Sequence, residues 1–277
     1  MSAFPIPEIA LEQHIAVLGK TGSGKSSTAR LIVEHVAPHD RVCILDPIKS
    51  DWWGITGNGT GPGLPFVILG GPHGHTQLRP EAGAAVGDLV GNGSIKHCIV
   101  DMADFKMGGT NRFFCDFADA LMKEMRGILY LVIEEAHEFA PKERAGTGHE
   151  NMAIYYAKKL ATAGRTKGIR LIVVTQRVQQ LHNAVLDSCE TMISHRFTTP
   201  ASQKPVADWL KSNADKGQAA EIAASMSSLK TGEAWVCSGE ANMFERVTFP
   251  KFATYDNTKT PTANSVKYVV TKAPVDL

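Results

Sequence analysis

The stretch His14-Ile-Ala-Val-Leu-Gly-Lys-Thr-Gly-Ser-Gly-Lys-Ser26 decides the fold class of this chain. Its apolar run predicts a buried strand, and the segment Gly19–Ser26 that follows has the pattern G-x-x-x-x-G-K-S. Glycines let successive backbone N–H groups turn toward a phosphate, and the expected next helix points its positive dipole end at the same anion. Lys25 can reach the β- and γ-phosphates, and Ser26 can supply a hydroxyl to Mg²⁺. The sequence therefore predicts a P-loop that binds ATP and Mg²⁺.

The nucleotide is expected to contact the whole loop and the serine after it. A chance glycine turn is the alternative, but the complete pattern between a strand and a helix argues against it. The expected ATP-binding residues are Gly19, Lys20, Thr21, Gly22, Ser23, Gly24, Lys25, Ser26 and Ser27.

Length and composition indicate one α/β domain. The 277 residues are 43% hydrophobic, which suffices for one sizeable core. The formal net charge of +1 gives no global field that would draw the chain to DNA or to a membrane. The N-terminus lacks a basic n-region, and the apolar runs are far shorter than the roughly 20 residues of a membrane span. The scattered cysteines fit core positions in a reducing compartment, so we expect a cytoplasmic protein without membrane contact.

Short apolar runs alternate with stretches of helical period, which predicts a mostly parallel central sheet with helices on both faces. Residues 1–250 are expected to form one ATPase domain, and residues 251–277 a tail that docks on its own domain or on a neighbouring subunit. The expected strands are about His14–Leu18, Arg41–Asp46, Phe66–Leu69, His97–Asp101, Leu129–Glu134, Leu171–Thr175, Thr191–Phe197, Glu233–Cys237 and Phe244–Phe249. The expected helices are Gly24–Val36, Arg112–Met125, Asn151–Ala163, Ser202–Lys211 and Gly217–Met226.

Two carboxylates close the apolar strand that begins at Leu129. Glu134 is expected to face the Mg²⁺ shell through a metal-bound water, and Glu135 to polarise the water that attacks the γ-phosphate. Asp101 ends a similar strand and is the rival metal carboxylate. Asp46 ends a third, before a proline, and is interpreted as the cap of a turn.

A polar pair also ends the strand Leu171–Thr175, where the amide of Gln176 can hydrogen-bond both the γ-phosphate and the attacking water. Upstream, Arg165 lies in a basic turn and can neutralise charge in the transition state. A surface glutamine and a solvated turn are the respective alternatives, and spacing alone does not decide between them.

Three linked motifs resemble the HerA–FtsK superfamily, closest to HerA-like ATPase cores that lack the N-terminal β-barrel. They are HIAVLGKTGSGKS (14–26), LVIEEAHEF (131–139) and GRTKGIRLIVVTQR (164–177). The resemblance implies a RecA-like ASCE fold, a homohexameric ring and ATP-driven DNA translocation. It assigns Lys25, Ser26, Glu134, Glu135 and Gln176 the roles given above. It also matches Arg165 to an arginine that acts on the neighbouring subunit's nucleotide, with Arg196 as a second candidate.

Basic loops are the expected DNA contacts. Lys142 and Arg144 begin a glycine-containing loop, and Lys106 and Arg112 flank a second one. Contacts of this kind would grip the phosphate backbone without reading sequence. A solvated surface is the alternative.

The leading function is an ATP-hydrolysing ring motor that translocates or pumps DNA, as a HerA-like translocase or helicase or a viral-type packaging ATPase. The alternative is an assembly or defence-system ATPase that gates a partner effector, such as a nuclease, without moving DNA. A small-molecule kinase is a third hypothesis, against which Glu135 and Gln176 argue because they favour water as the acceptor.

Overall fold

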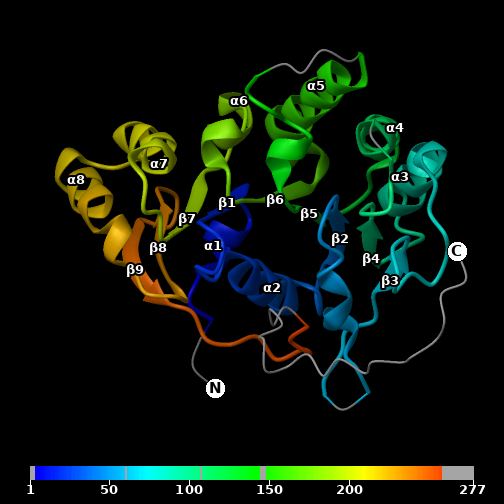
Figure 1. Ribbon diagram of the computed structural model, residues 1–277, viewed down its shortest axis with the longest axis horizontal. Helices are drawn as coiled ribbons and strands as arrows, with labels where there is room; N and C mark the ends of the chain where they lie inside the picture. Colours follow the sequence, from blue (N-terminus) through cyan, green and yellow to red (C-terminus); the bar gives the residue numbers. More distant parts are fainter. Residues whose placement is uncertain (1–3, 60, 107, 144–147, 258–277) are drawn as a thin grey trace, which may run out of the picture.

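The computed structural model describes residues 4–59, 61–106, 108–143 and 148–257, and their strands form one nine-stranded sheet. The strand order is β3-β4-β2-β5-β6-β1-β7-β8-β9 (Figure 1). All pairings from β3 to β7 are parallel, whereas β8 and β9 extend the sheet in antiparallel fashion. The strands are β1 (Ile15–Leu18), β2 (Arg41–Asp46), β3 (Val67–Leu69), β4 (His97–Asp101), β5 (Leu129–Ile133), β6 (Ile169–Thr175), β7 (Thr191–His195), β8 (Glu233–Ser238) and β9 (Met243–Thr248).

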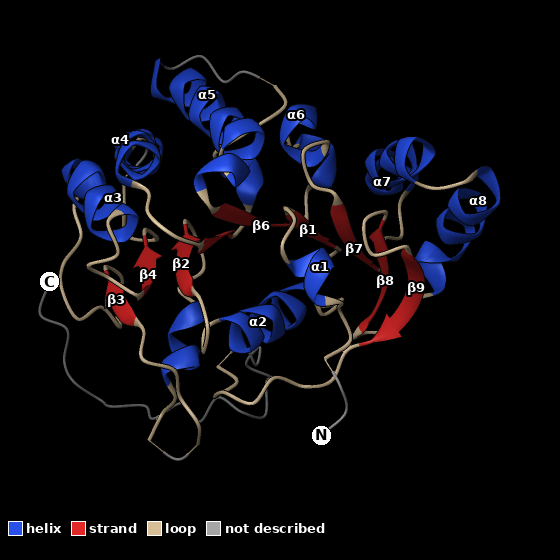
Figure 2. Ribbon diagram, turned by 180° about the vertical axis from the view of Figure 1, so that it is seen from behind, coloured by secondary structure: helices blue, strands red, loops and turns tan. Residues whose placement is uncertain are grey.

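Helices cover both faces of the sheet (Figures 1 and 2). The helices α1 and α2 lie on one face, and α3 to α8 lie along the other. The mostly parallel α/β architecture predicted from the sequence is thus the observed one. The helices are α1 (Glu8–Leu11), α2 (Lys25–Val36), α3 (Gly83–Gly91), α4 (Gly109–Glu124), α5 (Gly148–Ala163), α6 (Asn183–Leu186), α7 (Pro200–Asn213) and α8 (Lys216–Ser225).

The strands separate two apolar cores because successive side chains point to opposite faces of a sheet. On β1, Ile15 and Val17 pack in the core beneath α2, whereas Ala16 and Leu18 pack in the core beneath the other helices. Both sets are completely buried. Burial on both faces explains why β1 reads as a continuous apolar run.

The sequence analysis missed α3 because its glycines hide the helical pattern. Gly83, Gly87 and Gly91 lie one turn apart and face α4. A methyl group added at Gly83 or Gly87 would lie 2.3 or 2.4 Å from a backbone oxygen of α4. Glycine is therefore the residue that lets α3 approach α4 this closely, although it lowers intrinsic helix propensity.

Part of the expected tail lies against the ATPase fold. Glu34 on α2 accepts hydrogen bonds from the backbone N–H groups of Ala253 and Thr254, both at 2.8 Å. Residues 258–277, the rest of the expected tail, lie outside the described residues. None of the helices in the described ranges is long and apolar enough to cross a membrane.

Candidate active site

The loop between β1 and α2 is crowded by the neighbouring strand β7. A methyl group added at Gly19 would lie 2.5 Å from the Ser23 hydroxyl and 2.6 Å from His195 Cβ. Gly24 adopts a φ of 107°, in the left-handed region that favours glycine. The backbone N–H of Lys20 donates to the carbonyl of Arg196 at 3.1 Å. These contacts hold the predicted P-loop at the carboxyl end of β1, where α2 begins at Lys25.

His195 connects the start of α2 to the neighbouring strand β8. Its Nδ1 lies 3.0 Å from the carbonyl of Glu233, so Nδ1 donates and Nε2 accepts from the Thr28 hydroxyl at 3.0 Å. Burial lowers the pKa of His195 to about 4. The neutral imidazole therefore ties the first turn of α2 to β8.

Ser26 and Glu134 lie on one small cavity. The Ser26 hydroxyl is 3.4 Å from Glu134 Oε1, and Glu134 Oε2 is buried without a hydrogen-bond partner. The cavity holds about 20 Å³, which is room for one water molecule or a bare ion. A hydroxyl beside carboxylate oxygens is a ligand set that Mg²⁺ accepts, so these residues fit the predicted metal site.

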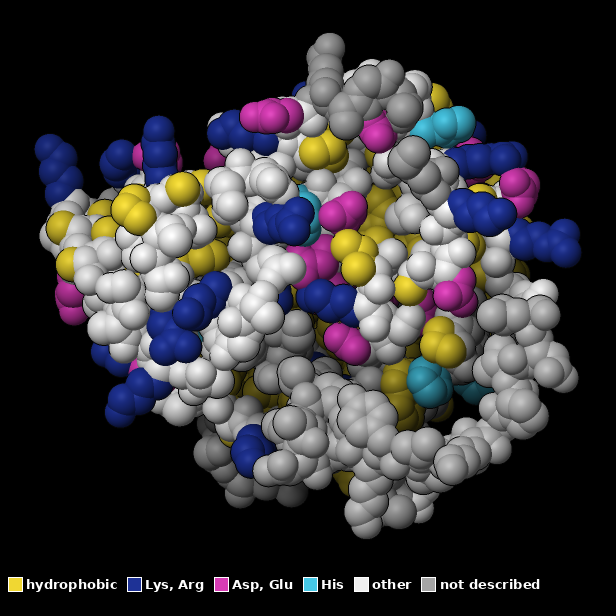
Figure 3. All heavy atoms as spheres, in the orientation of Figure 1, with side chains coloured by type: hydrophobic (Ala, Val, Ile, Leu, Met, Phe, Trp, Pro, Cys, Tyr) yellow, Lys and Arg dark blue, Asp and Glu magenta, His cyan; other side chains and the backbone are white. Residues whose placement is uncertain are grey.

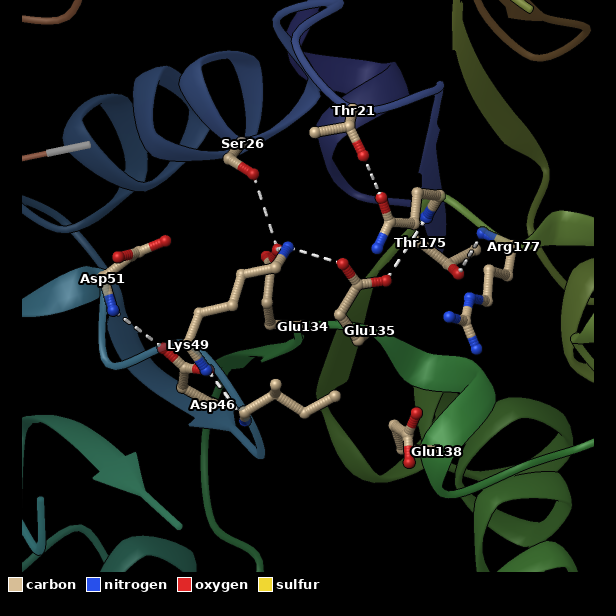
Figure 4. Close-up of polar contacts among 12 residues, drawn as sticks. Thr21, Ser26, Asp46, Lys49, Asp51, Glu134, Glu135, Glu138, Thr175 and Arg177 are labelled. Carbon is tan, nitrogen blue, oxygen red and sulfur yellow. Dashed lines mark hydrogen bonds and ion pairs between the residues drawn. The ribbon is translucent and has the colours of Figure 1, made fainter. Parts of the chain in front are cut away.

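Glu135 has an unusual backbone conformation. Its φ of 44° and ψ of 50° place it in the left-handed region, which costs a non-glycine residue on the order of 1–2 kcal/mol. In a regular strand, Glu134 and Glu135 would point to opposite faces. The turn at Glu135 brings both buried carboxylates into one site (Figure 4). Such local strain commonly accompanies functional sites.

Gln176 connects the acidic pair to the P-loop. Its side-chain oxygen accepts from the Thr21 hydroxyl, and its backbone N–H donates to Glu135 Oε2 at 3.3 Å. His137 adds a second connection that the sequence analysis did not single out. Its Nδ1 lies 2.9 Å from the Thr175 hydroxyl and 3.5 Å from Glu135 Oε2. The residues at the end of β6 therefore form hydrogen bonds with both the P-loop and the segment of the acidic pair.

Lys49 is the main residue that the sequence analysis missed. Its Nζ lies 3.0 Å from Glu134 Oε1 and 2.5 Å from Glu135 Oε1 (Figure 4). Burial by itself would lower the pKa of Lys49, but the two carboxylates outweigh it and raise the pKa above its usual range. A lysine three residues after a strand-ending aspartate was the available signal.

Asp46 caps the turn that positions Lys49. Its Oδ1 accepts from the N–H groups of Ile48 and Lys49 at 3.3 and 2.9 Å, and its Oδ2 accepts from that of Asp51 at 3.2 Å. Burial raises the pKa of Asp46 to about 6, against these hydrogen bonds. Asp101, the rival metal carboxylate, ends β4, and β2 separates it from the strand that carries Glu134.

The two candidate arginines lie at opposite ends of the strands, Arg165 at the amino end of β6 and Arg196 at the carboxyl end of β7. Arg165 precedes β6, whose seven residues span about 20 Å, and pairs with Glu190 at 2.6 Å. Arg165 is thus far from its own P-loop. Arg196 follows β7 and lies beside its own loop, where its carbonyl bonds Lys20. Its Nε is buried without a hydrogen-bond partner.

The expected DNA loops follow β4 and β5, at the same edge as the P-loop. Lys106 and Arg112 line one cavity, where Arg112 pairs with Glu81 at 2.7 Å. The backbone N–H of Lys142 donates to the carbonyl of Gln180 at 2.6 Å, and Arg144 lies outside the described residues. Figure 3 shows basic side chains spread over one face, at its upper margins, in its centre and at its lower left, with acidic ones among them.

The topology defines the class of protein. One strand, β6, separates the acidic strand β5 from the P-loop strand β1, and β6 ends in the polar pair Thr175–Gln176. The P-loop, the acidic pair and Gln176 meet at the carboxyl edge of these strands. This arrangement is that of a RecA-like P-loop NTPase of the ASCE type.

Sequence comparisons agree with this class. Residues 7–49 match the family model described as the central domain of helicase HerA. A probable DNA double-strand break repair helicase HerA from Methanocaldococcus jannaschii is 30% identical over 122 residues, 44% of this chain and 22% of the relative. The DNA double-strand break repair helicase HerA of Pyrococcus furiosus is 36% identical over 75 residues, 27% of this chain and 13% of the relative. The chain thus spans less than a quarter of the length of these relatives.

Solved structures share the fold at low sequence identity. The genome packaging NTPase B204 of Sulfolobus turreted icosahedral virus 2 superimposes with a TM-score of 0.57 at 16% identity, covering 87% of this chain and 98% of that one. VirB4 of Thermoanaerobacter pseudethanolicus superimposes with a TM-score of 0.58 at 14% identity, covering 87% of this chain and 89% of that one. The chain is thus similar to HerA-like ATPases in part of its sequence, and it shares its fold with these solved structures.

Proposed function

We propose that this chain hydrolyses ATP with Mg²⁺ and couples hydrolysis to the movement of DNA through a ring of six copies. The observation that carries the hydrolytic part is the convergence of Ser26, Glu134, Glu135 and Gln176 at one end of the P-loop. Two buried carboxylates beside a hydroxyl and an amide suit water as the acceptor of the phosphoryl group.

The proposed roles follow from the contacts. Backbone N–H groups of the loop and Lys25 bind the phosphates, and Ser26 and Glu134 hold Mg²⁺, which would neutralise phosphate charge. Glu135 orients and deprotonates the attacking water. Gln176, bonded to Thr21, links the γ-phosphate to β6.

The HerA relatives are named for DNA double-strand break repair and B204 for genome packaging, which supports DNA as the substrate of the motor. Lys106, Arg112, Lys142 and Arg144 would contact the phosphate backbone, and such contacts weaken steeply with salt. Arg165 would complete the neighbouring subunit's site because it lies far from its own. Arg196 is the alternative, but its place beside its own loop favours a role in the same subunit.

Steady-state ATPase activity with and without DNA tests the proposal. Wild type should release phosphate in a Mg²⁺-dependent reaction that DNA accelerates, whereas Lys25→Ala should lose nucleotide affinity. Substituting Lys106 and Lys142 together by glutamine should remove the DNA stimulation and leave the basal rate. A hexamer whose rate is indifferent to both duplex and single-stranded DNA would contradict DNA movement.

The alternative is an ATPase that gates a partner effector or nuclease. The Arg112–Glu81 pair and the net charge of +1 favour it, since both reduce the attraction for DNA. Stoichiometric co-purification with an effector, together with a rate that DNA leaves unchanged, would support this candidate.

A further inference from the structure

A second, larger cavity opens beside the first turn of α2. It measures about 350 Å³. Gly24, Ser27 and Thr28 form one wall, Thr231 and Gly232 before β8 form another, and the segment after β9 closes it. Ser27 lines both this cavity and the small one at Glu134, so the two adjoin along the P-loop.

The strand order places the larger cavity on the nucleoside side of the loop. The acidic pair ends β5, on one side of the P-loop strand β1, whereas β8 and β9 lie on the other side. A triphosphate with its γ-phosphate at Glu135 therefore directs its nucleoside toward β8. The small cavity, at about 20 Å³, holds no base, whereas about 350 Å³ is in the range of small-molecule sites.

The wall after β9 is partly aromatic. Phe249, Pro250 and Phe252 line the cavity beside the charged Lys251 and Asp256, and the aromatic surface suits a flat heteroaromatic base. The guanidinium of Arg30 lies 4.5 Å from the centre of the Phe252 ring and belongs to the small cavity. Phe252 thus lines both cavities, with Arg30 over one face of its ring.

The segment that carries Phe252 is fastened to α2; we call residues 250–257 the strap. Arg30, only 3% exposed, donates to Thr254 Oγ1 at 2.9 Å, to the Tyr255 carbonyl at 2.8 Å and to Asn257 Oδ1 at 3.1 Å. Glu34, one turn later on α2, accepts from two backbone N–H groups of the strap. The P-loop helix itself therefore sets the position of the aromatic wall.

We propose that this cavity holds the base and ribose of the bound nucleotide, with Phe252 stacked on the base. Arg30 acts as a positioning residue because it holds the strap without lining the larger cavity. The proposal rests on the proposed function, since it assumes that the triphosphate occupies the P-loop. It extends that function by making the strap part of the nucleotide site.

Binding of ATP and of inorganic tripolyphosphate to the full chain distinguishes the proposed base site from the binding of phosphates at the P-loop. Tripolyphosphate occupies the P-loop without a base. Phe252→Ala should weaken ATP about 10- to 100-fold, as expected for loss of base stacking, and leave tripolyphosphate within about twofold. Phe252→Trp, which keeps an aromatic face, should restore ATP binding. Arg30→Lys should shift the ratio of ATP to tripolyphosphate affinity in the same direction as Phe252→Ala.

Tyr155→Ala is the matched control, because it removes an exposed aromatic ring from α5 on the other face of the sheet. It should change neither affinity. Equal ATP binding by Phe252→Ala and wild type, or equal losses of ATP and tripolyphosphate, would overturn the base site and leave the P-loop assignment standing. Wild type that binds neither ligand would overturn both.

Discussion

Lys49→Met tests how much the acidic pair depends on its internal cation. The side chains of Glu134 and Glu135 are 2% and 1% exposed, and Lys49 contacts both. Methionine keeps the approximate volume but removes the ammonium that lies within 3.0 Å of both buried carboxylates. Removing one member of a buried ion pair costs roughly 3–5 kcal/mol, and we expect about 3 kcal/mol because Lys49 is 26% exposed. At roughly 2–4 °C per kcal/mol, the Tm should fall by about 6–12 °C.

Thermal unfolding in buffer with a chelator measures this fall, and a second series adds Mg²⁺ and ATP. The divalent cation should raise the Tm of Lys49→Met more than that of wild type, because it supplies the charge that the variant lacks. Lys123→Met is the matched control: it removes an exposed ion pair with Asp119 on α4 and should have a much smaller effect. Equal Tm changes for the two variants would refute the stabilising role of Lys49.

Three further outcomes are expected. Glu135→Gln should retain ATP but lose about 10²–10⁴ in turnover, measured as phosphate release; wild-type turnover would exclude Glu135 as the base. His195, with a pKa of about 4 against about 6.5 when unfolded, binds fewer protons in the folded state. Stability should therefore fall as the pH drops from 6.5 to 4, by up to about 3 kcal/mol, and urea titrations of His195→Gln should show a shallower fall. Arg165→Ala should lower turnover, and mixing with Lys25→Ala subunits should restore part of it; mixtures that stay inactive would argue against action in trans.

The strands and the P-loop could be predicted because their signals are local. Apolar runs such as Ile15–Leu18 are buried on both faces, and the G-x-x-x-x-G-K-S pattern marks the turn between strand and helix. Glu134 and Glu135 were found for the same reason, since they directly end such a run. The left-handed backbone at Glu135 has no such signal, because it follows from contacts within the folded site.

Lys49 and the strap could not be predicted from local pattern. Lys49 reaches the acidic pair across 85 positions in sequence, and the strap contacts α2 across more than 200. Neither segment has a strand or helix period. The predicted roles of Glu135, Gln176, Arg165 and the basic loops stay predictions until the variants are measured.

The separation of Arg165 from the P-loop constrains how copies of this chain can associate. A twofold dimer can satisfy a contact between Arg165 of one copy and the loop of the other only if both groups lie in one self-complementary patch. Where they lie on two different surfaces, the contact is heterologous. Repetition of one rotation either closes into a ring or continues as a filament, and in both cases all subunits point the same way around the path. An assembly of this kind has an inherent direction, which a machine that moves along a polymer requires.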